Sequence, residues 1–273
     1  MHIAVGSMFR NSEGYIGRYV AQFNALVQAA PQHTFEPILA EGDSTDRSWE
    51  MLNDAFPGHV IKREHGGRWF GVSGPDWHTS ADDPQCMSQV SFVCNGVLEM
   101  VKPDHDVLLW VESDIIWQPS TMLALISWLK NPNWEPVTEY TTGTVMWEGV
   151  DAVAPLCIGN ELWHFRVHPL LNARGRHPYC NCKDPSAVHL YDWWGLEAEG
   201  RKFQVCPPFH PMLEKEASLY PMDTVGSCLV MRGNVARECR YDPPERGMSG
   251  FCENIRSHGY KIWLDPKLKV RHP

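Results

Sequence analysis

Short apolar runs alternate with segments of helical spacing along the first 62 residues. The apolar runs cover residues 3–7, 35–40 and 60–62, and each is typical of a buried strand. Between the first two runs, apolar residues in 15–30 recur at the spacing of one helix face. A second helix is expected through 49–52. This alternation of strand and helix predicts a parallel sheet with helical crossovers.

Two local features qualify these elements. Pro37 weakens the prediction of a strand at 35–40, because proline cannot donate a hydrogen bond to a neighbouring strand. Ser44 or Thr45 is expected to cap the second helix, since both stand just before its apolar residues.

Residues 107–111, with the sequence VLLWV, form the most continuous apolar run of the chain. A run that is apolar on both faces is typical of a strand in the middle of a parallel sheet. We expect a helix at 86–101 before this strand and another from Pro119 to Trp128 after it.

The second half of the chain is less regular. Residues 166–188 are rich in Arg, His, Pro, Asn and Cys, which predicts a long loop. The remaining expected elements are strands at 151–158, 224–232, 261–264 and 268–270, and a helix at 250–259. Neither an internal repeat nor a Gly/Ser linker interrupts the chain, so one domain is expected.

Composition narrows the class of protein. The chain has 273 residues, 43% of them hydrophobic, and a formal net charge of -9. That balance is typical of a globular protein, and it argues against a simple electrostatic nucleic-acid binder, which would carry a basic stripe. No run approaches the roughly 18 apolar residues of a membrane span, and no signal peptide is visible. We therefore expect no membrane span and a cytoplasmic location.

Polar residues follow three of the expected strands, where ligands bind in an open α/β sheet. Ser7 and Arg10 follow the first, Glu41 and Asp43 the second, and Glu112-Ser113-Asp114 the strand at 107–111. Two carboxylates one residue apart repel each other when buried, and a hard divalent cation relieves that repulsion. Mg²⁺ or Mn²⁺, shared with substrate phosphates, is the usual solution. The alternative interpretation of 112–114 is a solvated turn.

Four separated segments then stand in a characteristic order. They are residues 3–11 (IAVGSMFRN), 39–46 (LAEGDSTD), 112–114 (ESD) and 250–272 (GFCENIRSHGYKIWLDPKLKVRH). Together they resemble the GT-A fold glycosyltransferases of the family-2 type, which carry a nucleotide-contacting first turn, a DDGSTD segment, a D-x-D metal motif and a closing FC..R..GY.I..DP....H segment. The resemblance implies an α/β, Rossmann-like, mostly parallel sheet flanked by helices. It divides the single domain 1–273 into a nucleotide-binding half, 1–115, and an acceptor-binding half, 116–273.

The resemblance also implies roles for individual residues. Glu112, Asp114 and His272 would hold the divalent cation, and Glu41 would touch the base of the donor nucleotide. The residues expected to bind the donor are Ser7, Phe9, Arg10, Glu41, Asp43, Arg68 and Ser113.

A fifth match concerns the acceptor side. Residues 153–156 (VAPL) and 191–195 (YDWWG) resemble segments of fungal Golgi and capsule mannosyltransferases, and of phage-encoded glycosyltransferases thought to modify hydroxymethylated DNA bases. Aromatic faces stack on sugars or bases, and a carboxylate accepts hydrogen bonds from sugar hydroxyls. Asp192 is therefore expected at the catalytic centre, and the acceptor would contact Tyr191, Trp193, Trp194 and Asp223. A tryptophan-rich core corner is the alternative.

One departure from the family concerns the general base. Inverting members place a carboxylate pair where this chain has Gly247-Met248. Glu253 or Glu245 would substitute, with Glu253 the candidate base and a helix-surface ion pair its alternative. An enzyme that retains configuration, using the leaving phosphate as base, is equally open.

Cysteine and histidine gather in one stretch of the second half. Cys180, Cys182, Cys206 and His210 have a spacing unlike that of a standard zinc finger. A structural Zn²⁺, a disulfide and unrelated thiols are the three interpretations, and unrelated thiols are favoured.

The predicted function is a metal-dependent transfer of sugar from a nucleotide sugar to a hydroxyl. A UDP-sugar is favoured as donor over GDP-mannose, and the acceptor would be a glycan or a modified DNA base, in the host cytoplasm if the chain is phage-encoded. A nucleotidyltransferase and a non-catalytic sugar- or nucleic-acid-binding module are the alternatives. The first normally opens with a glycine-rich loop, which residues 6–10 lack.

Overall fold

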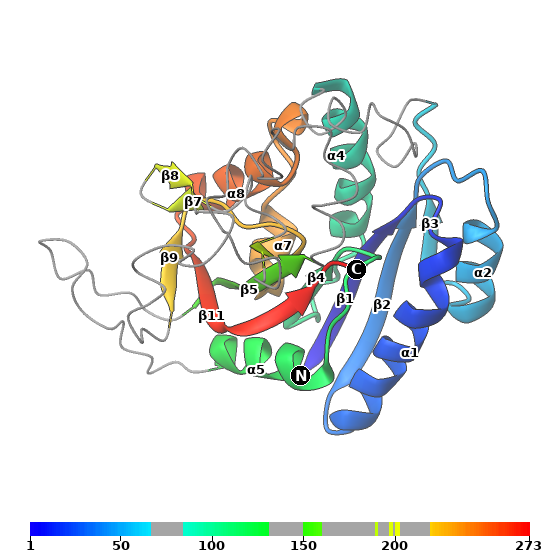
Figure 1. The fold of residues 1–273 in the computed structure, drawn as a ribbon, viewed down its shortest axis with the longest axis horizontal. Helices are drawn as coiled ribbons and strands as arrows, with labels where there is room; N and C mark the ends of the chain where they lie inside the picture. Colours follow the sequence, from blue (N-terminus) through cyan, green and yellow to red (C-terminus); the bar gives the residue numbers. More distant parts are fainter. Residues whose placement is uncertain (67–83, 131–149, 160–188, 191–196, 199, 203–218) are drawn as a thin grey trace, which may run out of the picture.

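The computed structural model describes residues 1–66, 84–130, 150–159, 189–190, 197–198, 200–202 and 219–273. Within them, one nine-stranded sheet has the order β3-β2-β1-β4-β10-β5-β11-β9, with β6 paired to β5 (Figure 1). Its strands are β1 (His2–Phe9), β2 (Thr34–Glu41), β3 (Val60–Lys62), β4 (Val107–Val111), β5 (Ala152–Gly159), β6 (His189–Leu190), β9 (Tyr220–Met222), β10 (Cys228–Arg232) and β11 (Ile262–Arg271).

The sheet is mixed but mostly parallel. Strands β1, β2, β3 and β4 run parallel to one another, and β11 runs parallel to β5. Strand β10 lies antiparallel between β4 and β5, and β9 is antiparallel to β11. The prediction of an α/β fold with a mostly parallel sheet flanked by helices is confirmed.

Helices cover both faces of the sheet (Figure 1). One apolar core lies under α1 (Glu13–Ala29), α2 (Ser48–Ala55) and α5 (Pro119–Lys130). The other lies under α4 (Pro84–Glu99), α7 (Gly233–Glu238) and α8 (Gly247–Ser257). All five residues of β4 are buried, which explains why that strand is apolar on both faces. A 3₁₀ turn η1 (Pro244–Arg246) and a small pair, β7 (Glu197–Ala198) with β8 (Arg201–Lys202), complete the described elements.

Pro37 fits inside β2 for a local reason. Strand β3 pairs only with Leu39, Ala40 and Glu41, so the edge of β2 at Pro37 faces no described strand on that side. The N–H of Leu39, two residues further on, donates to His59 O on the β3 side. Because alternate residues of a strand direct their N–H groups to the same side, the nitrogen of Pro37 faces that side too and not β1. The missing N–H therefore breaks no ladder between described strands.

Three local predictions were wrong. The strand expected at 224–232 begins only at Cys228, because Ser227 has a φ of 25°, outside the extended region. Neither Ser44 nor Thr45 caps α2, whose Ser48 N–H instead donates to the Asp46 carboxylate at 3.0 Å. The two strands expected at 261–264 and 268–270 are one strand, β11, with a shift of register between Asp265 and Lys269.

Several predictions concern residues outside the described part of the chain. They include the loop at 166–188. The individual residues are Arg68, Cys180, Cys182, Tyr191, Asp192, Trp193, Trp194, Cys206 and His210.

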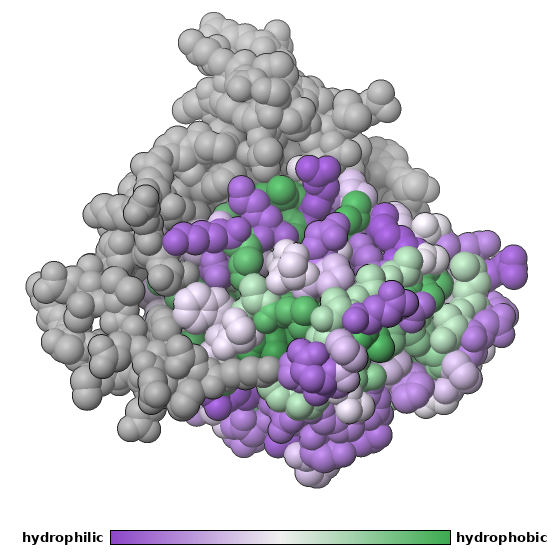
Figure 2. All heavy atoms as spheres, turned by 90° about the horizontal axis from the view of Figure 1, so that it is seen from below, coloured by the Kyte–Doolittle hydropathy of each residue, from purple (hydrophilic) through white to green (hydrophobic). Residues whose placement is uncertain are grey.

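Among the described residues, no helix is both long enough and apolar enough to cross a membrane. Figure 2 shows one face, on which polar side chains border a more apolar central area.

Candidate functional site

The candidate site lies at the carboxyl ends of β1, β2 and β4. Because these strands are parallel and adjacent, the turns that follow them meet at one edge of the sheet. The end of β11 reaches the same edge, since Arg271 forms a β-bridge with Ile116 in the turn after β4.

Asp114 and His272 meet directly at this edge. The Nε2 atom of His272 lies 2.8 Å from Oδ2 of Asp114. The two side chains are 11% and 28% exposed, so the pair is mostly buried but can be reached from solvent. The family resemblance implied that both residues belong to one metal site, and the structure brings them into contact.

Backbone pairing fixes where His272 stands. Ile116 N–H donates to Arg271 O at 2.7 Å, and Arg271 N–H donates back to Ile116 O at 2.9 Å. The N–H of His272 itself donates to Ile158 O of β5 at 2.9 Å. Residues 271 and 272 are therefore held between β5 and the turn after β4. This pairing fixes the backbone that carries the His272 side chain.

Glu112 begins the turn that carries Asp114, and its backbone is held by the second half of the chain. Its N–H donates to Ser227 O at 2.9 Å, which ties the start of the turn to the segment before β10. Burial above all, with the negative charge of Glu112 in addition, raises the pKa of Cys94 and of Tyr241 well above the usual values. Among the described residues, Glu112 does not join Asp114 and His272 in a group of three ligand atoms within 4.8 Å.

The Asp114–His272 pair suits a divalent cation. Two neighbouring ligands of an octahedral ion, each about 2.1 Å from it, stand about 3 Å apart. The 2.8 Å between the carboxylate oxygen and the imidazole nitrogen is close to that separation. Carboxylate oxygen and imidazole nitrogen are also ligands that Mn²⁺ accepts. The residues present therefore fit the predicted metal.

Ser113 lies beside Ser12, in the turn after β1, whereas Ser7 and Phe9 are buried in β1 itself. The hydroxyl oxygens of Ser113 and Ser12 are 3.5 Å apart. Ser7 is fully buried, and its hydroxyl donates to Val111 O at 2.6 Å. Phe9 is buried against Tyr19, with ring centroids 5.0 Å apart. The donor-binding roles of these residues stay predictions.

Glu41 is a fully buried carboxylate at the end of β2. Its Oε1 accepts a hydrogen bond from Ser44 N–H at 2.6 Å. Its Oε2 is buried as well, and has no hydrogen-bond partner among the described residues. A buried carboxylate oxygen without a donor is costly, and its burial is explained when a water, an ion or a bound molecule supplies the missing partner.

Asp43 and Arg10 shape the turn next to Glu41. Oδ2 of Asp43 accepts the N–H groups of His65 at 2.9 Å and Gly66 at 2.6 Å. Burial opposes ionisation of Asp43, but these two bonds and the nearby charges of His65 and Arg10 hold its pKa below the usual value. Arg10 donates through Nε to Asp43 O at 3.4 Å, and burial lowers the pKa of Arg10.

Asn11 ends the segment 3–11 of the family resemblance, but the sequence assigned it no role of its own in this site. Its φ of 47° places it in the left-handed region, where asparagine is one of the few side chains tolerated. Its Oδ1 accepts Thr45 N–H at 2.8 Å, and its own N–H donates to Ser44 Oγ at 2.9 Å. Asn11 thereby joins the turns after β1 and β2. An asparagine in a strand-to-helix turn is the one signal that could have indicated it.

Asp223 and Glu253 have partners in the second half of the chain. Gly200 N–H donates to Asp223 Oδ2 at 2.9 Å, and Arg256 lies 3.5 Å from Oδ1. The carboxylate of Glu253 is paired with Arg246 on the exposed side of α8. This ion pair is the alternative stated for Glu253, and its role as a general base stays a prediction, as does acceptor binding by Asp223.

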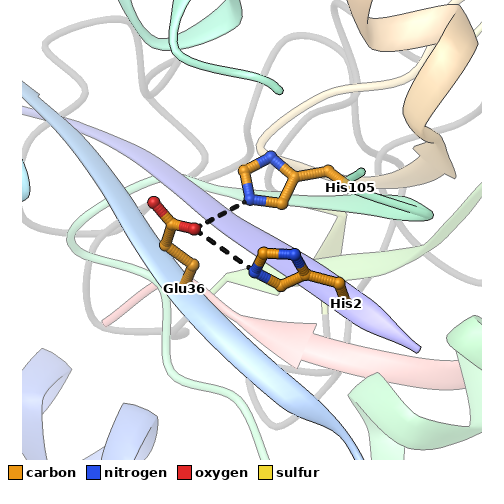
Figure 3. A group of neighbouring side chains, drawn as sticks. All are labelled: His2, Glu36 and His105. Atoms are coloured by element: carbon orange, nitrogen blue, oxygen red, sulfur yellow. Dashed lines mark hydrogen bonds and ion pairs between the residues drawn. The ribbon is translucent and has the colours of Figure 1, made fainter. Parts of the chain in front are cut away.

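A second cluster lies away from this site, at the opposite ends of β1 and β2. Figure 3 shows the Nε2 atoms of His2 and His105 directed at Oε2 of Glu36, at 3.2 and 3.1 Å. Among the described residues, these side chains are the one group of three possible metal ligands within 4.8 Å of one another.

The hydrogen bonds of this cluster indicate a hydrogen-bonded ion-pair network and not a metal site. Nδ1 of His105 accepts the N–H of Lys102 at 3.0 Å, so the proton of the neutral ring is on Nε2, where a metal would need a lone pair. The Lys102 ammonium also donates to Glu36 at 2.6 Å, which places a positive charge at the same carboxylate. Burial opposes ionisation of Glu36, but the bonds from Lys102 and His105 lower its pKa to about 2.

Comparison with known proteins finds similar solved structures but no similar sequence family. No protein-family model matches the sequence, and no curated protein matches it significantly. The chain is similar to the structure of S. aureus TarS 1-349 in complex with UDP, with 13% identity and a TM-score of 0.47. The match covers 99% of this chain and 60% of that one, so this chain spans about three fifths of the TarS fragment.

It is also similar to glucosyl-3-phosphoglycerate synthase from Mycobacterium tuberculosis in complex with Mn²⁺, UDP and glucosyl-3-phosphoglycerate. Identity is 12%, the TM-score is 0.43, and the match covers 100% of this chain and 72% of that one. A further similar structure is mannosyl-3-phosphoglycerate synthase from Rubrobacter xylanophilus, with 13% identity and a TM-score of 0.36 over 57% of this chain and 40% of that one. At these values the assignment of function depends on the residues of this chain.

Proposed function

We propose that this chain is a single-domain GT-A glycosyltransferase that transfers a sugar from a nucleotide sugar to a hydroxyl group with the help of Mn²⁺ or Mg²⁺. The observation that carries the proposal is the contact between Asp114 and His272, 2.8 Å apart at the carboxyl edge of the sheet. The one-domain assignment is supported by the sheet, which takes neighbouring strands from both halves of the chain.

Asp114 and His272 are the residues that would hold the metal. When bound, the cation neutralises the negative charge that develops on the diphosphate leaving group. His272 binds as neutral imidazole, because its Nε2 lone pair must face the ion. Glu112, two residues before Asp114, is proposed to bind the same ion through water, because Glu112, Asp114 and His272 do not form a group whose ligand atoms all lie within 4.8 Å of one another.

Glu41 is proposed to recognise the base of the nucleotide. Its buried Oε2 lacks a donor among the described residues, and the imide N–H of uracil is a donor of the right kind. Guanine also offers an N–H, so Glu41 by itself does not distinguish UDP from GDP. A UDP-sugar remains the favoured donor.

The hydroxyl acceptor is proposed to be a glycan or a hydroxymethylated base in phage DNA, and the location to be the cytoplasm, which is that of the host if the chain is phage-encoded. This part of the proposal depends on Tyr191, Asp192, Trp193 and Trp194, which lie outside the described residues. Its support is the sequence resemblance alone.

Thermal unfolding with UDP and Mn²⁺, added separately and together, tests the proposal. A ligand present at about 100 times its Kd stabilises the folded state by about 2.7 kcal/mol, which raises Tm by several degrees in a chain of this size. We expect that rise only when both are present. Turnover of a UDP-sugar, followed as release of UDP, then separates an enzyme from a binding module, which would show the shift without turnover. A shift with UDP alone that Mn²⁺ does not increase would contradict the metal site.

A further inference from the structure

Two side chains of α1 hold the turn that carries Asp114. Arg18 donates through Nη2 to the backbone oxygen of Asp114 at 2.6 Å. Gln22 donates through Nε2 to Ile115 O at 3.2 Å, and its Oε1 accepts Trp117 N–H at 3.2 Å. Three hydrogen bonds therefore join α1 to the backbone of residues 114, 115 and 117.

The opposite side of the same turn is held by β11. Ile116 exchanges two backbone hydrogen bonds with Arg271, the residue before His272. Inside the turn, the N–H of Ile115 donates to Glu112 O at 3.2 Å. The position of Asp114 relative to His272 thus depends on this bond, on the pairing of Ile116 with Arg271 and on the contacts from α1. Among the side chains of α1, Arg18 is the one that binds the carbonyl of Asp114.

Both α1 side chains are well placed to act as rigid supports. Arg18 and Gln22 are one helical turn apart, so they project from the same side of α1. Buried Tyr19 and Phe23 next to them anchor that helix in the core. The guanidinium of Arg18 lies 5.3 Å from the centre of the Tyr15 ring, which restricts the side chain further.

We propose that Arg18 and Gln22 are positioning residues for the metal-binding pair Asp114 and His272. The inference rests on the proposed function, because it assigns these residues to the same site. Side chains that orient metal ligands through hydrogen bonds typically change metal affinity about 10- to 100-fold when they are removed. Arg18 and Gln22 act on Asp114 through its backbone and touch neither the donor nor the metal.

The test compares Arg18→Met and Gln22→Ala with Gln28→Ala in the full chain. Gln28 is an exposed glutamine of the same helix, so its replacement controls for loss of a polar side chain from α1. The first readout is the NMR signal of the His272 ring in the metal-free protein at one fixed pH, with Asp114→Ala marking the position of the unpaired ring. We expect Arg18→Met and Gln22→Ala to move the signal toward that position, and Gln28→Ala to leave it unchanged.

The second readout is Mn²⁺ affinity in the presence of UDP, measured from the EPR signal of free Mn²⁺. We expect affinity about 10-fold weaker in both variants, with Tm within a few degrees of wild type for Gln22→Ala. Wild-type affinity in Arg18→Met and Gln22→Ala, or a His272 signal that stays in place, would overturn the positioning role. If the wild-type chain binds no Mn²⁺, the proposed function fails, and the metal-free NMR comparison alone decides whether α1 sets the Asp114–His272 contact.

Discussion

The imidazole of His272 and the carboxylate of Asp114, 158 residues apart in the chain, stand 2.8 Å from each other. Residues at such a separation meet only because β11 pairs along β5 and then bridges to the turn after β4. The contact joins the first half of the chain, which would bind the nucleotide, to its last strand. It is the geometric basis of the proposed metal site.

Asp114→Asn should abolish most turnover while the fold survives. An amide keeps the size of the side chain but loses the charge that holds a cation, and losing one such electrostatic element typically costs about 10²–10³ in rate. Release of UDP from a UDP-sugar measures the loss. Asp54→Asn, at an exposed position of α2, is the matched control and should retain wild-type turnover. Equal activity of the Asp114 variant would exclude it as a metal ligand.

His272→Gln should weaken Mn²⁺ binding by about 10-fold or more, because the amide replaces an imidazole nitrogen. Stability should stay close to wild type, since the pairing of His272 with Ile158 uses the backbone N–H. His258→Gln makes the same substitution at an exposed histidine after α8, so it controls for the loss of an imidazole elsewhere in the chain. Calorimetric titration with Mn²⁺ at saturating UDP makes the comparison, and an unchanged Kd would be incompatible with a ligand role.

Glu41→Gln should stabilise the free protein and weaken UDP binding. The amide oxygen keeps the hydrogen bond from Ser44 N–H, so the amide NH₂ takes the place of the partnerless Oε2. A neutral group is then buried where a carboxylate stood, which favours folding. The NH₂ meets the N–H of the base donor to donor, and we expect UDP affinity to fall about 10-fold.

Thermal unfolding and UDP titration measure both effects in one protein. Glu50→Gln, on an exposed position of α2, should change neither quantity. Tighter UDP binding in Glu41→Gln would show that Glu41 does not accept a hydrogen bond from the base.

Glu36 should make stability depend on pH far from the candidate site. Its pKa is about 2 in the folded chain against an ordinary value of 4.5. A carboxyl with a lowered pKa contributes stability that is present above the ordinary value and is lost as pH falls from there toward 2. Allowing for solvent screening, that contribution is about 1–2 kcal/mol.

Urea unfolding at a series of pH values checks this prediction. The free energy of unfolding of the wild-type chain should exceed that of Glu36→Gln above about pH 5, and the two should converge in acid. The exposed Glu50→Gln should follow the wild-type curve. Parallel curves for wild type and Glu36→Gln would show that the contacts of Glu36 with Lys102 and His105 do not stabilise the fold.

Local pattern was enough to predict the parallel strands of the first half of the sheet. The apolar run 107–111 is buried on both faces as β4, and the acidic residues that follow it stand at the sheet edge, as parallel topology requires. The antiparallel insertion of β10 was not predicted, because the sequence of a five-residue apolar strand does not reveal the direction in which the strand runs. Ser227 was missed for a similar reason, since its positive φ is set by tertiary contacts.

The candidate site was less accessible to local reasoning. Family resemblance, not spacing, indicated His272, because nothing near the end of the chain reveals that Arg271 will pair with Ile116. Arg18 and Gln22 look like ordinary polar positions of an amphipathic helix, and only the folded turn shows that they bind its backbone. The free oxygen of Glu41 is likewise a property of packing, not of the residue type.

Anomalous X-ray diffraction from crystals grown with UDP and Mn²⁺ shows whether Asp114 and His272 bind the metal. We expect a manganese peak within bonding distance, about 2.1–2.2 Å, of both an Asp114 oxygen and the His272 Nε2, with the diphosphate on the same ion. A peak at another place, or UDP bound while Asp114 and His272 keep their direct contact without metal, would contradict it.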